Sequence, residues 1–252
     1  MSNTIFRAAS ILLCLSDGIN TVSDIAEHTK ISKTTVHRLL TALEESQLAM
    51  KDPLNHRYYL GHLIAHIGSQ LKTTHEHMII CATDELKHLS DYTEETVSLG
   101  IQVGIQYLSL CEIPSKHDPI IIIESRRMVP LLAGATSKVL LSQLNDEEME
   151  LILQFIKLEP ITDHTITDKE KFIADVKQAR QQGCAITYGE RLPGFIGMAA
   201  AVCNYTCPAV LNILGPEIRL KPRLNEFLEE LKASAGRVSR NITKIFQLKE
   251  AK

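Results

Sequence analysis

The sequence has no long hydrophobic run. No segment reaches the roughly eighteen consecutive apolar residues that a membrane-spanning helix needs. The first ten residues, MSNTIFRAAS, also lack the apolar core of a secretory signal peptide. We therefore expect a cytoplasmic protein that has no membrane partner.

Cysteines are few and scattered. They stand at positions 14, 81, 111, 184, 203 and 207. In a chain without an export signal, scattered cysteines are expected to be reduced thiols rather than a disulfide framework. Cys203 and Cys207 form a lone pair with three residues between them, and His62 and His66 lie one helical turn apart. Neither pair has the additional ligands that a zinc site needs, so we expect no metal and no other cofactor.

Motifs of common enzymes are also missing. The sequence contains no G-x-S-x-G elbow, no P-loop and no H-E-x-x-H zinc motif. Asp163 and His164 are neighbours, but no nucleophile accompanies them in the sequence. We therefore expect no catalytic residues, and an enzyme is the disfavoured alternative.

The chain has no excess of positive charge. Its formal net charge is −3, with 23% charged and 44% hydrophobic residues, which is the composition of an ordinary globular protein. A length of 252 residues fits one small domain and one larger domain. Any partner of opposite charge must therefore be recognised by a local cluster rather than by the whole surface.

The clearest positive pattern is a pair of short helices within residues 21–60. A helix is expected from about Val22 to Thr29, and a short link at 30–32 joins it to a second helix. Ser32 is a good N-cap for that second helix, because its hydroxyl can accept a bond from an unpaired amide of the first turn. An apolar stripe at helical spacing follows it, formed by Val36, Leu39, Leu40 and Leu43.

Another helix and a hairpin flank this pair. Upstream, apolar residues at positions 8, 11, 12 and 15 form a helical stripe that ends at Asp17-Gly18. Downstream, strands at 48–51 and 57–60 are joined by the turn formers of residues 52–56. This order of elements predicts a winged helix-turn-helix domain over residues 1–61, a domain whose second helix enters the major groove of double-stranded DNA.

Polar side chains of this domain suit base edges and phosphates. The expected DNA-binding residues are Ser32, Lys33, Thr34, Thr35, His37 and Arg38 around the second helix, and Lys51, His56 and Arg57 on the wing. Six basic residues are balanced by six acidic residues within 1–60, so the positive charge is focused rather than general. Because phosphate contacts drive affinity, a neutral domain needs two copies on the DNA, which predicts a homodimer.

The remainder of the chain predicts a linker helix and an α+β domain. Helical spacing continues over 62–76 and again from Met78 to Tyr92, and the second domain is expected over 77–252. Strands are expected at 96–101, 105–110, 120–123, 184–188, 198–203 and 209–214, and helices at 133–144, 146–156, 169–182 and 224–246. Such an order favours helices packed on a mostly antiparallel sheet.

Two segments of this second domain are candidates for contact with a small molecule. Residues 131–138 are small and polar at a helix start, where exposed amides favour an anion such as a carboxylate. Residues 191–197 form a glycine-rich turn that enters a strand. Both segments could equally serve only packing and turn formation.

Nearly the whole chain resembles the IclR family of bacterial transcriptional regulators. The resemblance rests on these segments: RAASILLCLSDG at 7–18, DIAEHTKISKTTVHRLLTALEE at 24–45, RYYLG at 57–61, AGATSKVLLS at 133–142, ITD at 166–168, PGFIGMAAAV at 193–202 and LGP at 214–216. It implies an N-terminal winged helix domain and a C-terminal GAF-like effector domain. It also implies a dimer or a dimer of dimers, hence a tetramer, acting on palindromic operators in response to small organic acids.

The chain departs from the family at several motif positions. Where the family often has His-Ala-Thr-Ala-x-Gly-Lys, this chain reads Leu-Ala-Gly-Ala-Thr-Ser-Lys at 132–138. A family aspartate corresponds to Thr187, a cysteine to Gly197, and two serines to Asn212 and Leu214. Positions carried over as effector-binding residues are Gly134, Ala135, Ser137, Thr187, Gly197 and Asn212. These departures imply a pocket that is less polar than is usual in the family.

Together, these patterns predict a ligand-responsive transcriptional regulator, more often a repressor. Its partners would be an operator in double-stranded DNA, a small-molecule effector and other copies of itself. Two alternatives remain at this point. The second domain could serve only oligomerisation and bind no effector, or it could be an enzyme tethered to a DNA-binding domain.

Overall fold

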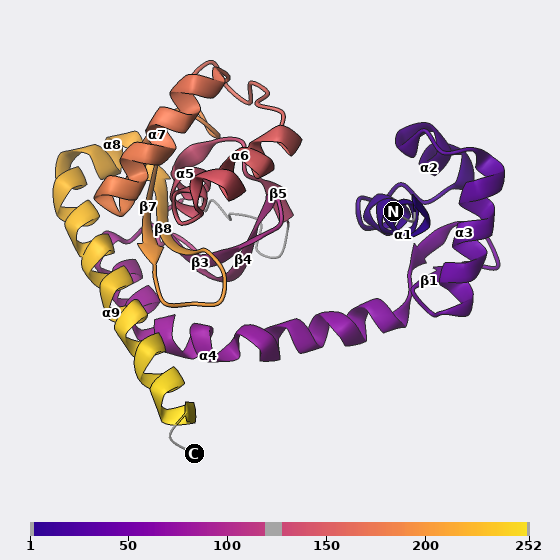
Figure 1. The fold of residues 1–252 in the computed structure, drawn as a ribbon, viewed down its shortest axis with the longest axis horizontal. Coiled ribbons are helices and arrows are strands. Elements are labelled where there is room, and N and C mark those ends of the chain that lie inside the picture. The colour runs from indigo at the N-terminus through magenta and orange to yellow at the C-terminus, as the bar shows by residue number, and fades with distance from the viewer. Residues whose placement is uncertain (1–2, 119–127, 251–252) are drawn as a thin grey trace. The chain divides into compact units, whose positions relative to one another are not determined.

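The computed structural model describes residues 3–118 and 128–250 (Figure 1). The chain divides into two compact units, Met1–Thr74 and His75–Lys252, and each is described by itself below. The boundary between them falls inside helix α4 (His62–Thr93). The strand expected at 120–123 lies outside the described residues.

The first unit is a three-helix domain with a small hairpin. Its elements are α1 (Asn3–Ser16), α2 (Val22–Thr29), α3 (Lys33–Glu45), β1 (Ala49–Lys51) and β2 (Tyr58–Leu60). The two strands pair antiparallel, with Met50 opposite Tyr59. This is the expected winged helix-turn-helix, with each strand of the wing one residue shorter than predicted.

The core of the first unit joins all three helices to the wing. Ile11 of α1, Ile25 of α2 and Leu40 of α3 are fully buried, and Tyr58 closes the core from the wing. The four apolar positions predicted for the second helix are all buried in α3. The apolar stripe therefore fixes which face of α3 remains free for a partner.

Helix α4 is longer than the sequence indicates. The helical stretches expected at 62–76 and from Met78 to Tyr92 form one 32-residue helix. Residues 72–77, Lys-Thr-Thr-His-Glu-His, carry no apolar side chain, so the hydrophobic spacing breaks although the backbone does not. No helix in the described ranges is long and apolar enough to cross a membrane.

The second unit is built on a six-stranded antiparallel sheet. Its strands are β3 (Thr96–Val103), β4 (Gln106–Ile113), β5 (Met128–Pro130), β6 (Cys184–Tyr188), β7 (Phe195–Val202) and β8 (Ala209–Pro216). They lie in the order β5-β4-β3-β8-β7-β6. The antiparallel α+β architecture predicted from the sequence is thereby confirmed. Strand β5 was not expected, and β7 begins three residues earlier than predicted.

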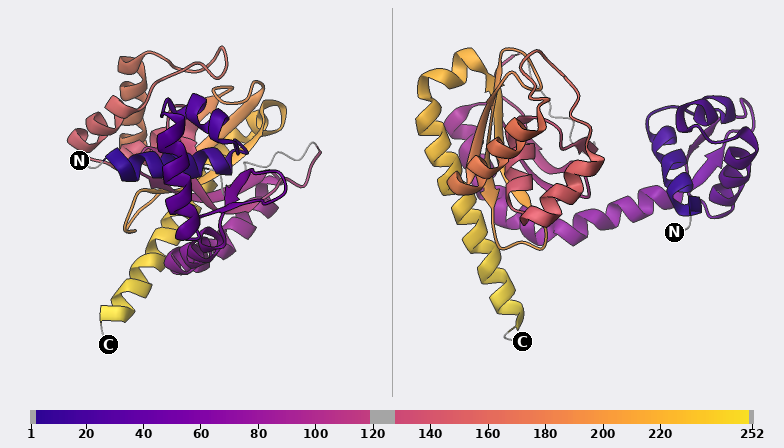
Figure 2. Two further views of the ribbon diagram at one scale, coloured as in Figure 1. Left: turned by 90° about the vertical axis from the view of Figure 1, so that its right-hand side faces the viewer. Right: turned by 45° about the horizontal axis from the view of Figure 1, so that its top comes forward.

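Helices cover both faces of this sheet (Figure 2). The remaining helices are α5 (Gly134–Ser142), α6 (Asp146–Phe155), α7 (Lys169–Gln182), α8 (Glu217–Leu220), the 3-10 turn η1 (Lys221–Arg223) and α9 (Leu224–Glu250). Side chains of α4 and α9 pack on one face, against Leu99 and Leu211 among others. Helices α5, α6 and α7 pack on the other face, around Phe172.

Strand alternation decides what the α5 side of the sheet presents. Since successive side chains point to opposite faces, Leu99 and Leu211 pack toward α4 and α9, while Ser98 and Asn212 point toward α5. Ser98 and Asn212 are directly opposite each other in the β3–β8 pairing. The sheet therefore places a pair of polar side chains under the start of α5.

Candidate functional sites

The start of α3 is fixed by Ser32. Its hydroxyl accepts a hydrogen bond from the amide of Thr35 at 3.4 Å and donates one to Oγ1 of Thr35 at 2.9 Å. Since Ser32 has one hydroxyl proton, the 3.2 Å contact with Thr34 requires that Thr34 donates. Lys30, at the C-terminal end of α2, adopts a left-handed conformation (φ 57°), which turns the chain sharply between α2 and α3.

The free face of α3 carries unpaired cationic and polar groups. Lys33, His37 and Arg38 are exposed, and within residues 3–118 and 128–250 none of these three side chains has a hydrogen bond or an ion pair. Thr34 is exposed as well, whereas Thr35 is half-buried. Side chains that have no partner in the folded chain are free to bind a phosphate or a base edge.

The wing presents the three remaining candidates. Lys51 holds its Nζ 5.6 Å from the centre of the Tyr58 ring, and the Arg57 guanidinium donates to Oδ1 of Asn20 at 3.1 Å. His56 is exposed in a left-handed conformation (φ 58°) at the tip of the turn. Of the nine expected DNA-binding residues, only Thr35 is not an exposed residue.

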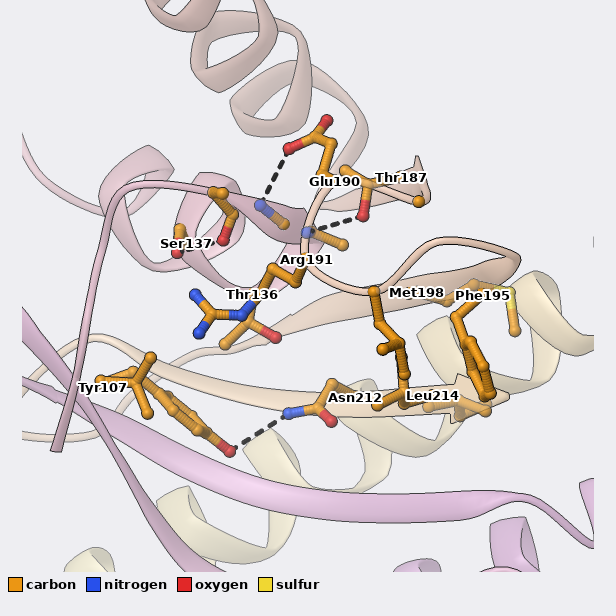
Figure 3. A pocket seen from close by; sticks show the side chains of 18 of the residues that line it. Tyr107, Thr136, Ser137, Thr187, Glu190, Arg191, Phe195, Met198, Asn212 and Leu214 are labelled. Atoms are coloured by element: carbon orange, nitrogen blue, oxygen red, sulfur yellow. Dashed lines mark hydrogen bonds between the residues drawn. The ribbon is translucent and has the colours of Figure 1, made fainter. Parts of the chain in front are cut away.

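The second unit contains a cavity of about 270 Å³ between α5, the loop 189–194 and the sheet (Figure 3). All six positions carried over as effector-binding residues line it, namely Gly134, Ala135, Ser137, Thr187, Gly197 and Asn212. Apolar side chains form much of the wall, including Val129, Phe195 and Leu214. The structure therefore brings the two candidate segments of the sequence to one site.

The start of α5 is occupied by side chains of the chain itself. The amide of Gly134 donates to Oε2 of Glu190 at 2.9 Å, and the amide of Ala135 donates to Oγ1 of Thr187 at 3.1 Å. The Ser137 hydroxyl donates to the carbonyl of Ala133 at 2.8 Å. The prediction that exposed amides at this helix start would bind an anion is thus wrong for Gly134 and Ala135, because an internal carboxylate and a hydroxyl already accept from them.

A buried ion pair holds Glu190 in this position. Nζ of Lys138 lies 2.5 Å from Oε1 of Glu190 and 2.6 Å from Oδ2 of Asp175. Only 3% of the Lys138 side chain and 7% of the Glu190 side chain are exposed. Both oxygens of Glu190 therefore have partners, and its charge is compensated within the protein.

The floor of the cavity is a small hydrogen-bonded cluster. Ser98 donates to Oδ1 of Asn212 at 2.9 Å, and Nδ2 of Asn212 donates to the Tyr107 hydroxyl at 3.3 Å. Ser98 has one hydroxyl proton and donates it to Asn212. In the 3.2 Å hydrogen bond between Ser98 and Tyr107, the Tyr107 hydroxyl is therefore the donor. Burial raises the pKa of Tyr107, so the phenol stays neutral.

Among the described residues that line the cavity, Arg191 is the one cation. Figure 3 shows it reaching from the loop 189–194 into the pocket. Within the described parts of the chain, its guanidinium has no hydrogen bond and no ion pair. Arg191 is an exposed residue, and nearby protein atoms desolvate its guanidinium in part and lower its pKa, although an arginine remains charged at neutral pH.

The sequence did not single out Tyr107 or Glu190, and it indicated Arg191 only as the first residue of the candidate segment 191–197. Tyr107 carries no signal in the sequence beyond an aromatic residue in a strand. Glu190 and Arg191, by contrast, are the two charged residues of a connection rich in glycine and proline, Tyr-Gly-Glu-Arg-Leu-Pro-Gly at 188–194. Charged residues in such a tight turn could have indicated a binding site, because loops positioned by a rigid scaffold often carry binding groups.

The described residues hold no cluster of three or more His, Cys, Asp or Glu side chains that could bind a metal ion. The charged groups at the cavity are two carboxylates bound to one lysine, and one arginine. This donor set suits an organic molecule held by hydrogen bonds and one ion pair rather than a metal.

Both units match described protein families. Residues 70–240, more than half of the chain, match the family described as "Bacterial transcriptional regulator IclR C-terminal", and residues 4–53 match the "IclR helix-turn-helix domain". The HTH-type transcriptional regulator KipR of Bacillus subtilis is 28% identical over 245 residues, which cover 96% of this chain and 97% of KipR.

Solved structures share the fold. An IclR-type transcriptional regulator from Alicyclobacillus acidocaldarius superposes with a TM-score of 0.76 at 24% identity, covering 96% of this chain and 99% of that chain. An IclR homologue from Microbacterium hydrocarbonoxydans, solved with 4-hydroxybenzoate, gives a TM-score of 0.72 at 17% identity, covering 96% of this chain and all of that chain. With a winged helix-turn-helix, a cavity-bearing α+β unit and family matches over both, the chain belongs to the IclR family of bacterial transcriptional regulators.

Proposed function

We propose that this regulator binds a palindromic operator as a homodimer or a dimer of dimers, and that a small organic acid bound in the second unit changes its affinity for DNA. We further propose that it acts in the cytoplasm, where its DNA partner is, that it represses transcription, and that it catalyses no reaction. Repression is the commoner outcome in the family that the sequence resembles.

The observation that carries this proposal is the free face of α3. Lys33, His37 and Arg38 project from a helix whose opposite face is buried, and no group of the described chain neutralises them. A recognition helix needs unpaired donors of this kind, because bidentate contacts from arginine to guanine and contacts from lysine to phosphate supply specificity and affinity.

Two copies are needed for binding of useful strength. Residues 1–60 carry as many acidic as basic residues, so one unit offers few net phosphate contacts. Two recognition helices placed about 34 Å apart, one turn of DNA, would read two half-sites of a palindrome. An effector that favours one arrangement of the dimer would then change operator affinity.

Binding of fluorescent operator fragments, selected from genomic DNA, tests the role of α3. Arg38→Ala should weaken operator binding by about 1–3 kcal/mol if Arg38 contacts a base. Arg7→Ala removes an exposed arginine from α1 of the same unit and serves as the matched control. Equal affinities for wild type and Arg38→Ala would remove Arg38 from the interface, and a protein that selects no fragment at low salt would overturn the proposal.

The alternative is a second unit that only oligomerises. The cavity and the unpaired Arg191 favour an effector, and the relative solved with 4-hydroxybenzoate shows that a protein of this fold can hold a small organic acid. Thermal-shift screening against small carboxylic acids, 4-hydroxybenzoate included, separates the two. Stabilisation together with altered operator affinity supports sensing, whereas neither effect with any acid supports oligomerisation alone.

A further inference from the structure

One charged side chain at the cavity has no partner among the described residues. The charged residues in the described lining are Glu190 and Arg191, and both oxygens of Glu190 are taken by Lys138 and by the amide of Gly134. The guanidinium of Arg191 has no partner in the described parts of the chain. Among the described lining residues, Arg191 is therefore the charged group that remains available to a ligand.

Gly134 makes room for Arg191. A Cβ at position 134 would lie 3.0 Å from Cδ and 3.4 Å from Cγ of Arg191, closer than ordinary contact. Gly134 also has φ +88°, a conformation that a residue with a Cβ rarely adopts. At the position where the resembled family often has threonine, glycine thus lets the arginine stem cross the start of α5.

The loop that carries Arg191 is held at several points. The hydroxyl of Thr162 donates to the carbonyl of Gly189 at 2.7 Å, and that of Thr165 donates to the carbonyl of Glu190 at 2.7 Å. The amide of Gly189 donates to the carbonyl of Phe195 at 2.8 Å. Arg191 is therefore presented from a fixed backbone, which reduces the entropy lost when its guanidinium binds an anion.

The rest of the lining does not suit a second negative charge. The Tyr107 hydroxyl donates its proton to Ser98, and the Asn212 amide has one hydrogen left after donating the other to Tyr107. This floor can bind a hydroxyl or a carbonyl group but offers no cation. Elsewhere the described wall is largely apolar, with Phe195 and Leu214 among its residues, so a second carboxylate against it would lie without a partner among the described side chains.

We propose that the pocket selects a small monocarboxylate, whose carboxylate pairs with Arg191 and whose apolar body lies against the wall that contains Phe195 and Leu214. A volume of about 270 Å³ is below the roughly 300 Å³ at which pockets for drug-sized ligands begin, so the body is compact. Gly134 is a positioning residue for this contact. The inference rests on the proposed sensing function and names the class of its ligand.

Isothermal titration calorimetry on the full chain tests the proposal without DNA. The probes are benzoate, phenylacetate and hexanoate, each compared with its primary amide, and terephthalate as a dicarboxylate. At least one monocarboxylate should bind about 10-fold or more tightly than its amide and than terephthalate, because a hydrogen bond between charged groups contributes about that factor.

Variants assign the charge to Arg191. Arg191→Gln should weaken the best monocarboxylate about 10- to 100-fold and leave its amide unchanged, while Arg191→Lys should keep part of the affinity. Arg240→Gln removes an exposed arginine from α9, on the other face of the sheet, and is the matched control. Gly134→Ala should weaken monocarboxylate binding in the wild-type background. It should have little further effect when combined with Arg191→Gln, since both substitutions act through the same guanidinium.

The outcomes separate this proposal from the proposed function. Equal binding of acid and amide, preference for terephthalate, or an unchanged affinity in Arg191→Gln would overturn the monocarboxylate class while leaving ligand sensing intact. Failure of all three monocarboxylates to bind, with operator binding retained, would also overturn it. If the wild-type protein binds no operator, by contrast, the proposed function as a DNA-binding regulator would be refuted, and the proposed ligand class would not.

Discussion

The ion pair under the pocket gives a sharp test of how the second unit is held together. Lys138 is almost fully buried and neutralises Glu190, which in turn accepts from the first amide of α5. Replacing Lys138 by Met keeps the volume and removes the charge, so Glu190 would remain buried without a counter-ion. Breaking a buried pair from one side costs about 3–5 kcal/mol, a large part of the roughly 5–15 kcal/mol that stabilises a domain.

Two further variants determine whether charge is the cause. Asp175→Asn removes the other, more exposed partner of Lys138, whose side chain is 37% exposed, and should cost no more than about 1 kcal/mol. The double variant Lys138→Met/Glu190→Gln removes both buried charges and keeps an oxygen that can accept from Gly134. It should recover about 2 kcal/mol or more relative to Lys138→Met alone, because no uncompensated charge remains.

Native-state hydrogen exchange measured by mass spectrometry suits a chain with two units. Peptides that cover α5 and β6 report the free energy of opening of the second unit, and peptides that cover α3 act as an internal control. Lys138→Met should lower the former and leave the latter unchanged. A fall of less than about 1 kcal/mol at α5, or a double variant as unstable as the single one, would refute the reasoning from uncompensated charge.

Three other perturbations are predicted from local geometry. Ser32→Ala removes the N-cap of α3 and should lower the opening free energy of α3 amides by about 1 kcal/mol, and unchanged exchange would contradict it. Gly100→Ala places a Cβ within the van der Waals radius of the Tyr107 ring, so the ring must move. The melting temperature should fall by the equivalent of about 1–3 kcal/mol. An unchanged melting temperature and an unchanged ligand affinity would show that the ring is not confined. A hydrogen bond from Arg223 lowers the pKa of Glu226 to about 2 from its usual 4.5, so its stabilisation is present above about pH 4.5 and is lost as the pH falls toward 2. The difference in melting temperature between wild type and Glu226→Gln should therefore narrow over that range, and a constant difference would be the contrary result.

Local patterns explain why much of the fold could be predicted. The cap at Ser32 and the buried stripe of α3 depend on residues within one or two turns of each other, and so does the start of α7 at Asp168, whose side chain accepts from the amide of Lys171 at 2.8 Å. Spacing also identified the neighbouring strands at 96–101 and 105–110, and Gly104 between them has the left-handed conformation that their turn requires. Short-range chemistry of this kind can be read directly from the sequence.

The contacts that build the pocket are of the opposite kind. Lys138 meets Glu190 from 52 positions away, and Ser98 meets Asn212 from 114 positions away. No periodicity connects such residues, since the antiparallel pairing of β3 with β8 brings one pair together and the packing of α5 against β6 brings the other. The continuity of α4 was missed for a related reason, because residues 72–77 have no apolar spacing and yet remain helical.

The occupied start of α5 changes where an anion should bind. A helix N-terminus attracts a carboxylate through its free amides, and here Glu190 supplies that carboxylate from within the chain. The same residue neutralises Lys138, so the lysine and the amides of Gly134 and Ala135 already have partners within the chain. Recognition of charge therefore passes to Arg191, the residue next to Glu190, whose stem crosses the helix start at Gly134. The ion pair and the ligand site are then coupled: Lys138→Met should weaken binding of the best monocarboxylate as well as stability, because it releases the loop that holds Arg191 in place.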